Sequence, residues 1–320
     1  MPAEPGTPAA QQVALGPGAD ALVRTALAGA DHPPEGQQTI RTGVFVVDPP
    51  FFGNGDIGRL AVCGVVNELV ATGAVARQVA VDVIVEAGLP VRLLERLTRS
   101  VREAAREAAV TVAAVDTKVV RLGEADQIFV AATAFGAAPA RPLRVRAVRP
   151  GDRVLVTAPL GDHAAHILAA RGAPGFEHYV PSDCAPLGGL LTTVLPLVRY
   201  ARPVAGGGLS AVLRSWAADR GLTVRVREAA LPVRHETRVA LGLQGVDPWD
   251  AACAGALCLF VPREAAPAVL ERLRAHPRGR GATAVGEVTD DVPGVVQLLG
   301  VDGVLRVVAE DADPEQPRMF

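Results

Sequence analysis

Apolar side chains recur along the chain at two spacings, and each spacing predicts a type of element. Residues 90–108 carry apolar side chains three or four positions apart, with most arginines and glutamates on the other face. This predicts an amphipathic helix that begins at Pro90. Residues 60–74 are almost wholly apolar and predict a buried helix. Short apolar runs predict strands at residues 39–50, 79–85, 110–115 and 128–136.

A segment rich in proline and arginine, residues 138–152, divides this first unit from a second one. There the pattern predicts helices at 162–171, 187–198, 211–218 (after the loop 201–210) and 263–275. It predicts strands at 153–161, 223–229, 255–261, 282–288, 295–300 and 304–310. We expect an arm at 1–38 with one helix near 21–28, domains at 39–145 and 146–310, and a tail at 311–320. Strands mixed with helices in both domains predict an α+β or mixed α/β fold.

Composition narrows the function classes. Hydrophobic residues make up 49% and charged residues 21%, enough for a sizeable core. A net charge of −2 without a basic stripe argues against nucleic acid, and no apolar run reaches the ~18 residues of a membrane span. The N-terminus lacks the features of a secretory signal, and four cysteines without metal-ligand spacing predict free buried thiols in a reducing compartment, the cytoplasm.

Lys118 is the only lysine among the 32 basic residues. In a chain that otherwise uses arginine, a retained lysine indicates a position that needs a compact ammonium on a flexible stem. It ends the triplet Asp116-Thr117-Lys118, directly after the predicted strand 110–115. An aspartate there suits a hard cation and a lysine suits a terminal phosphate, although an ordinary polar turn explains the same residues.

Two glycine turns precede predicted helices, and they contain Gly53, Gly55 and Asp56 in one case and Gly206 and Gly207 in the other. Glycines let backbone amides approach an anion, and a helix N-terminus favours negative charge. Asp56 is either a metal ligand or a helix cap, and plain turn and cap roles explain both segments as well.

Polar residues inside the predicted helices need partners. Asn67 and Glu68 interrupt the buried helix. Because an unpaired buried carboxylate costs on the order of several kcal/mol, Glu68 needs a cation, a metal or an exposed face. His163 and His166 lie one helical turn apart, but no acidic residue accompanies them, so we favour structural roles over metal binding.

Together these segments resemble one enzyme family. The run GDIGRLAVCGVVNEL resembles the GDIGKLAVCGTVNDL signature of the HypE carbamoyl dehydratases, and VDTKVV resembles their GDTKVV. Further matches, including GDHAAHILAARGAPGFE and SDCAPL, follow in the family's order from about Gly43 to Gly303. The resemblance implies a two-domain PurM-like fold with an N-terminal dimerising β-barrel domain, like that of aminoimidazole ribonucleotide synthetase, selenophosphate synthetase and thiamine-monophosphate kinase. It also implies a homodimer and the use of ATP with Mg²⁺.

The resemblance also implies site residues. The expected catalytic residues are Lys118 and Asp116. The expected ATP and phosphate ligands are Gly53, Gly55, Asp56, Asn67, Thr117, Lys118, Gly206 and Gly207. The expected metal ligands are Asp56, Glu68 and Asp116.

Several positions depart from the family pattern. Family chains end in Pro-Arg-Ile-Cys, whose cysteine carries the substrate, and Phe320 stands at that position here. Gly43 and Ala254 stand where the family has acidic residues, and Arg202 begins the segment that matches its Asp-Pro-Thr-Arg-Gly-Gly loop. Fewer carboxylates would weaken a site for a hard cation.

Three functions follow as alternatives. We favour an ATP-dependent enzyme that phosphorylates an amide- or carbamoyl-type oxygen on a substrate other than its own C-terminal cysteine, towards a nitrile or thiocyanate. The second is a degenerate HypE-like binding or scaffold protein, and the third is a hydrogenase maturation HypE with Cys253 as acceptor. A buried thiol is the simpler interpretation of Cys253. The expected partners are a second copy of the chain and a carbamoyl donor or other maturation or biosynthetic protein.

Overall fold

A four-stranded sheet organises the N-terminal half. The computed structural model describes residues 38–139, 141–173, 180–308 and 319, so the helix predicted near 21–28 lies outside the described residues. The strand order is β1-β6-β4-β5, antiparallel except for the parallel pair β4 and β5. The strands are β1 (Gln38–Phe45), β6 (Ile128–Ala137), β4 (Val75–Glu86) and β5 (Thr111–Val120).

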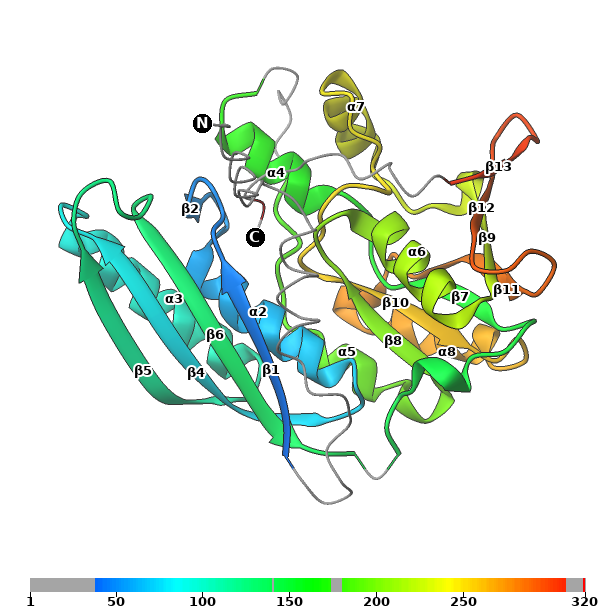
Figure 1. The fold of residues 1–320 in the computed structure, drawn as a ribbon, viewed down its shortest axis with the longest axis horizontal. Coiled ribbons are helices and arrows are strands. Elements are labelled where there is room, and N and C mark those ends of the chain that lie inside the picture. Colours follow the sequence, from blue (N-terminus) through cyan, green and yellow to red (C-terminus); the bar gives the residue numbers. More distant parts are fainter. Residues whose placement is uncertain (1–37, 140, 174–179, 309–318, 320) are drawn as a thin grey trace, which may run out of the picture. The chain divides into compact units, whose positions relative to one another are not determined.

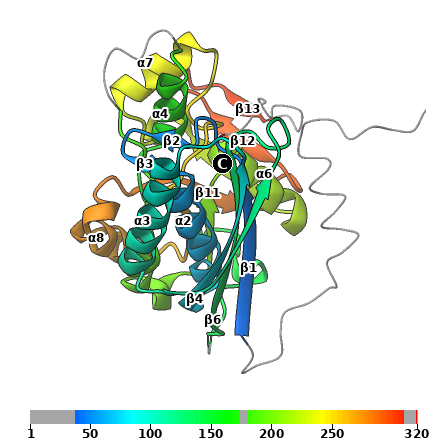
Figure 2. The same cartoon turned by 90° about the vertical axis from the view of Figure 1, so that its left-hand side faces the viewer.

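Two helices cover one face of this sheet (Figures 1 and 2). They are α2 (Ile57–Val70) and α3 (Val91–Glu107), and both confirm the helices predicted from the apolar pattern. Along β4 the alternate valines from Val79 to Val85 are buried on the helix side, whereas Asp82 and Ile84 between them are exposed. The sheet therefore has a helix-covered face and an exposed face.

A seven-stranded sheet organises the C-terminal half, in the order β13-β12-β9-β11-β7-β10-β8. Its strands are β7 (Arg153–Val156), β8 (Tyr200–Val204), β9 (Thr223–Arg227), β10 (Ala256–Val261), β11 (Thr283–Thr289), β12 (Val296–Leu299) and β13 (Leu305–Val307). Its helices are α4 (Asp162–Ala170), α5 (Gly188–Thr192), α6 (Gly208–Arg220), α7 (His235–Leu243) and α8 (Ala266–Ala275). The stacking of Trp216 from α6 on Phe260 from β10 helps to hold helix and sheet together.

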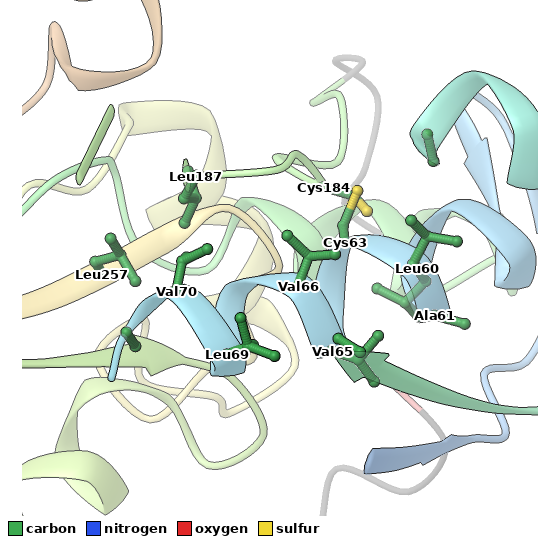
Figure 3. Packing of buried hydrophobic residues seen from close by; sticks show 14 of the residues in the cluster. Leu60, Ala61, Cys63, Val65, Val66, Leu69, Val70, Cys184, Leu187 and Leu257 are labelled. Carbon is green, nitrogen blue, oxygen red and sulfur yellow. The ribbon is translucent and has the colours of Figure 1, made fainter. Parts of the chain in front are cut away.

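α2 contacts both halves, which explains why its sequence is apolar nearly all round. One side packs on the four-stranded sheet, and on the other side Val70 faces Leu187 and Leu257 (Figure 3). The helix begins at the short hairpin of β2 (Phe51–Phe52) and β3 (Gly55–Asp56). Neither α2 nor any other helix in the described residues is long and apolar enough to cross a membrane.

Some predicted elements need correction. The helix predicted at 187–198 is α5 followed by a 3-10 turn at Leu195–Leu197, where Pro196 has no amide hydrogen to continue an α-helix. Part of the predicted loop 201–210 belongs to β8, which pairs with β10. The helix α7 was not predicted. The strand predicted at 110–115 continues to Val120 because β-branched residues follow it and β4 pairs with it throughout.

Candidate functional site

Asp116 and Lys118 lie on the exposed face of the four-stranded sheet. In the register of β4 and β5, Asp116 is paired with Asp82 and Lys118 with Ile84, and all four are exposed. Paired residues on neighbouring strands share a face, so Asp82, Asp116 and Lys118 form one group. Carboxylates on opposite strands repel each other unless a cation is near, and Lys118 is the adjacent cation. We call these three residues the exposed acid–lysine group.

Thr117 lies on the other side of β5, paired with the buried Val83. The expected position of the triplet after the end of a strand was wrong, because it lies within β5, where the period of two separates Thr117 from its neighbours. The alternative of an ordinary polar turn fails for the same reason. Phosphate binding by Thr117 together with Lys118 is not favoured by this geometry.

Asp56 caps α2. Its Oδ1 accepts hydrogen bonds from the backbone nitrogens of Gly58 (3.0 Å) and Arg59 (3.1 Å), and its Oδ2 lies 3.7 Å from Nε of Arg96. Burial raises the pKa of Asp56, while hydrogen bonds from Ser100 and the backbone and the charge of Arg96 oppose the increase. Of the two roles left open for Asp56, the structure shows the helix cap.

The glycine turn at residues 53–56 forms one wall of an open cleft of about 620 Å³, and α3 forms the other. Gly53 and Gly55 line this cleft with four arginines, Arg59, Arg92, Arg96 and Arg99. The cleft lies on the helix side of the four-stranded sheet, and the exposed acid–lysine group lies on the opposite face. The predicted phosphate ligands are therefore divided between two places in one chain.

Asn67 holds the segment 182–187 against α2. Its Nδ2 donates to the carbonyl of Ala185 (2.9 Å), and its Oδ1 accepts from the backbone nitrogen of Leu187 (2.8 Å). Two further side chains bind the backbone of the same segment, Asn54 and Arg59. With a 3% exposed side chain and both amide ends occupied, Asn67 could bind phosphate only if this clamp opened.

Glu68 has a protein cation as its electrostatic partner. Desolvation disfavours the charged form of Arg202, but the neighbouring Tyr200 and Glu68 favour it, and the net effect raises the pKa of Arg202. Of the alternatives that the sequence leaves open for Glu68, a cation, a metal or an exposed face, the structure shows a partly exposed side chain whose charge acts on Arg202. Across the described residues, no group of three or more His, Cys, Asp or Glu side chains could hold a metal ion. The predicted set of Asp56, Glu68 and Asp116 is not assembled within one chain.

On the exposed face of the four-stranded sheet, the carboxylates of Asp82 and Asp116 lie on paired positions and could together meet a divalent cation. Mg²⁺ is commonly bound through one or two carboxylates together with substrate phosphates, so this pair fits an ion that arrives with a polyphosphate. It does not fit an ion held by the protein alone.

Gly206 and Gly207 belong to the tight turn between β8 and α6. The φ angles of Gly207 and Gly208 are 73° and 65°, in the left-handed region that favours glycine. A Cβ atom on Gly208 would also lie 2.4 Å from the carbonyl oxygen of Trp249. The turn accounts for these glycines, and phosphate binding by Gly206 and Gly207 stays a prediction.

Asp183 lies beside Ala254, where the family pattern has an acid. Its carboxylate oxygens accept from the backbone nitrogens of Ala254 (2.9 Å) and Gly255 (3.0 Å). Burial raises the pKa of Asp183 to about 7. The adjacent Cys253 is fully buried, and burial raises the pKa of its thiol well above the usual value, which makes it a poor nucleophile. All four cysteines are free and buried, as predicted (Figure 3 shows Cys63 beside Cys184).

The two histidines have structural roles, as we favoured from the sequence. The ring of His163 is bonded through Nδ1 to Ser182 Oγ and through Nε2 to the carbonyl of Met319, both at 2.8 Å. Nδ1 of His166 donates to the carbonyl of Val180 (2.8 Å). Burial lowers the pKa of His163 to about 4, so its ring is neutral at pH 7. Both rings anchor backbone, and neither faces a group of acids in the described residues.

Sequence reasoning missed Asp82 and the arginine cleft, although both left signals. Asp82 is the one charged residue in the apolar run 79–85 and marks its outward face. The spacing of Arg92, Arg96 and Arg99 places them on one side of a helix. The electrostatic effect of Glu68 on Arg202 could not be predicted from the local sequence, because the two residues are 134 positions apart.

Both halves of the chain match models of one protein class. Residues 18–138 match the N-terminal domain of the AIR synthase related proteins, and residues 149–298 match their C-terminal domain. The described fold is thus that of an AIR synthase related protein, with a two-domain mixed helix and sheet architecture of the PurM-like kind.

Comparison with individual proteins identifies the family within the AIR synthase related class. The chain is 38% identical over 290 residues to carbamoyl dehydratase HypE of Azotobacter vinelandii, and the aligned residues cover 89% of this chain and 85% of the relative. It is 38% identical over 270 residues to that of Escherichia coli (strain K12), covering 83% and 80%. Solved structures similar to it include a HypE–HypF complex (TM-score 0.86, 31% identity, 92% and 99% covered) and a HypE in complex with ATP (TM-score 0.85, 32% identity, 92% and 91% covered). The chain belongs to the HypE carbamoyl dehydratase family.

Proposed function

We propose that this chain is an ATP-dependent HypE-like enzyme that activates an amide- or carbamoyl-type oxygen by phosphoryl transfer. Membership of the family supports ATP use, since a similar HypE has been solved in complex with ATP. The observation that carries the proposal is the exposed acid–lysine group, Asp82, Asp116 and Lys118. A lone ammonium beside two carboxylates matches the needs of phosphoryl transfer, where positioning and charge neutralisation supply most of the catalysis.

In the proposed reaction, the carbonyl oxygen of the substrate attacks the γ-phosphorus of ATP. An oxygen–phosphorus bond forms while the bond to the bridging oxygen of ADP breaks, and ADP leaves. Lys118 offsets the negative charge on the transferred group. Departure of phosphate and two N–H protons then leaves a carbon–nitrogen triple bond. Mg²⁺ bound with ATP would neutralise further phosphate charge, and Asp82 and Asp116 are the residues that would hold it.

A carrier other than the chain's own C-terminal residue is part of this proposal. Phe320, at the position of the family's acceptor cysteine, has no thiol. Cys253 is buried with a raised thiol pKa, which argues against it as an alternative acceptor. We infer that the acceptor belongs to a separate molecule. The solved complex of a relative with HypF supports a maturation protein as the kind of partner to look for, and we propose that this partner is a carbamoyl donor.

We also propose a homodimer that forms through the exposed face of the four-stranded sheet. Ile40, Val44 and Ile84 are 49%, 71% and 42% exposed, and their strand partners align them across that face. A face that combines apolar side chains with charged ones is typical of an interaction surface. A second copy would bury the apolar residues and bring two acid–lysine groups close to one interface.

One observation favours a second candidate function, a HypE-like binding protein without turnover. Arg202 stands where the family pattern has an aspartate, and no group of three or more side chains in the described residues could hold a metal ion. A protein that no longer needs the ion can tolerate such an exchange, whereas a catalyst must rely on the remaining pair Asp82 and Asp116.

Calorimetric titration of the full chain with magnesium–ATP tests the proposal. We expect binding that Lys118→Ala weakens about tenfold or more, because a charge-assisted contact to phosphate is lost. Arg121→Ala, a neighbouring exposed cation beyond the end of β5, is the matched control and should bind like the wild type. Absence of binding in the wild type, or equal weakening by both variants, would refute the proposed site.

A further inference from the structure

The cleft between the glycine turn and α3 carries more positive than negative charge. Four arginines line it, against the two carboxylates of Asp56 and Glu103. Asp56 is only 2% exposed, and its oxygens already serve the start of α2 and Arg96. The charge that faces the open space is therefore mainly that of guanidinium groups.

Two of the four arginines already have protein partners. Arg59 forms an ion pair with Glu107 (2.7 Å). Arg96 donates to the carbonyl of Gly55 (3.0 Å) and lies 5.3 Å from the centre of the Phe51 ring. The contacts of Arg96 hold α3 against the hairpin of β2 and β3, and Figure 2 shows the helix beside it. The ion pair of Arg59 with Glu107 joins α3 to α2.

The other two arginines, Arg92 and Arg99, are exposed at the cleft. In the described part of the chain neither makes a hydrogen bond or an ion pair. They stand four positions before and three positions after Arg96, so the three share one side of α3. Arg96 is fixed by its contacts, and this geometry presents the two unpaired guanidiniums towards one space.

The start of α3 adds a second reason to expect an anion. Pro90 at the N-cap makes no side-chain hydrogen bond to the first turn, and that turn contains no acidic residue. Instead it carries Arg92, although the positive end of a helix dipole disfavours a cation there. An anion bound at the cleft would interact favourably with both the guanidiniums and the helix end.

We propose that this arginine cleft binds the phosphate groups of a small phosphorylated ligand through Arg92 and Arg99. The planar guanidinium matches phosphate oxygens in pairs, which favours phosphate over a single carboxylate. Leu93 is the only apolar side chain that lines the cleft, and Arg96 covers the Phe51 ring, so a nucleobase finds no stacking surface there. The choice of a phosphorylated ligand rests on the proposed function. The cleft itself is independent of the proposed catalytic site, because the cleft and Lys118 lie on opposite faces of the sheet.

Calorimetric titration of the full chain with inorganic pyrophosphate at near-physiological salt tests this. We expect Arg92→Gln with Arg99→Gln to weaken binding about tenfold or more, from two lost charge-assisted contacts. The control double variant, Arg102→Gln with Arg106→Gln, removes the same charge from exposed positions of α3 outside the cleft and should change affinity less than about twofold. No binding by the wild type, or equal loss in both double variants, would overturn the proposal.

Two further arms separate this site from the proposed catalytic one. Pyrophosphate binding should survive Lys118→Ala, and its loss in that variant would place the anion at the acid–lysine group and overturn the cleft. Competition identifies the source of the phosphate groups: because the cleft offers a base no stacking surface, ATP should displace pyrophosphate no better than inorganic triphosphate does, and a clear preference for ATP would indicate a nucleotide instead. If ATP turnover fails while the arginine-dependent binding remains, only the catalytic proposal falls.

Discussion

Asn67 and Glu68 illustrate at the scale of single residues how a buried helix tolerates polar side chains. Each interrupts the apolar sequence of α2. Asn67 is buried and is hydrogen-bonded to backbone groups of the C-terminal half, whereas Glu68 is partly exposed and its charge acts on Arg202. A polar group that is paired when buried avoids the desolvation penalty and adds specificity to the packing. Contact between the halves therefore explains Asn67 before any ligand is considered, and partial exposure explains Glu68.

Asn67→Ala tests the clamp. Removing the amide leaves a buried carbonyl on Ala185 and a buried N–H on Leu187 without partners, so we expect a loss of roughly 2–4 kcal/mol in the free energy of unfolding. Thr98→Ala, at an exposed position of α3, is the control and should cost little. Urea unfolding followed by circular dichroism measures both. An Asn67→Ala variant as stable as the control would contradict the assigned role.

The raised pKa of Asp183 predicts how the free energy of unfolding depends on pH. Burial raises its pKa from 3.8 to about 7, so the folded chain holds this proton more tightly than the unfolded chain does. The stability it contributes is fully present below about pH 4 and is lost as the pH rises through about 7, by an amount of at most roughly 4 kcal/mol. Unfolding free energies of the wild type and Asp183→Asn at pH 4.5 and 7.5 measure this. The wild type should lose more stability than the variant over that range, and a difference between them that does not change with pH would rule the assignment out.

At the scale of elements, the alternation of β5 decides the candidate site. Because side chains on a strand point to opposite faces in turn, Asp116 and Lys118 share a face with Asp82 while Thr117 does not. A turn at the same residues would have allowed all three to converge. The register of β4 against β5 is thus the structural fact on which the acid–lysine group depends.

The turn before α6 gives an element-scale prediction. Gly208 has a φ of 65°, and a Cβ atom there would meet the Trp249 carbonyl oxygen at 2.4 Å, whereas Gly245 has a φ of 70° with nothing within 4 Å. Gly245→Ala should therefore cost about 1 kcal/mol from backbone strain alone. Gly208→Ala adds a clash with backbone and should cost clearly more, visible as a larger fall in melting temperature. Equal effects would show that the turn relaxes freely.

How far the sequence predicts these elements depends on whether their signal is local. The helices α2 and α3 and most strands were predictable because their apolar periods lie in one continuous run. The shortness of α5, the strand β8 and the helix α7 were not predicted, since each depends on pairing or packing with distant parts of the chain. For the same reason the residue types of the site were predictable, but not the separation of Asp56 and Glu68 from Asp116.

At the scale of the whole molecule, the exposed face of the four-stranded sheet is the feature that a single chain leaves unexplained. Its apolar residues extend across β1, β6 and β4 and end at the acid–lysine group on β5. One row of paired residues crosses all four strands, from Val44 on β1 through Ala131 on β6 and Asp82 on β4 to Asp116 on β5. A dimer through this face would link assembly directly to the proposed site.

Val44→Glu combined with Ile84→Glu should prevent that dimer. Like charges placed opposite their own copies, together with lost apolar contact, disfavour association while leaving exposed positions of the monomer fold intact. Light scattering after size-exclusion chromatography should give twice the chain mass for the wild type and a single chain mass for the variant. Val239→Glu on α7, also exposed, is the control. A wild type that is monomeric at all concentrations would contradict the proposed assembly.

The rate of ADP formation by Lys118→Arg tests the central claim most directly. Arginine keeps the positive charge but replaces a compact ammonium with a planar group, in a chain whose other 31 basic residues are already arginine. If Lys118 neutralises the transferred phosphoryl group, this variant should still bind ATP but lose about 100-fold or more in turnover. Turnover by Lys118→Arg equal to that of the wild type would show that the sole lysine takes no part in catalysis.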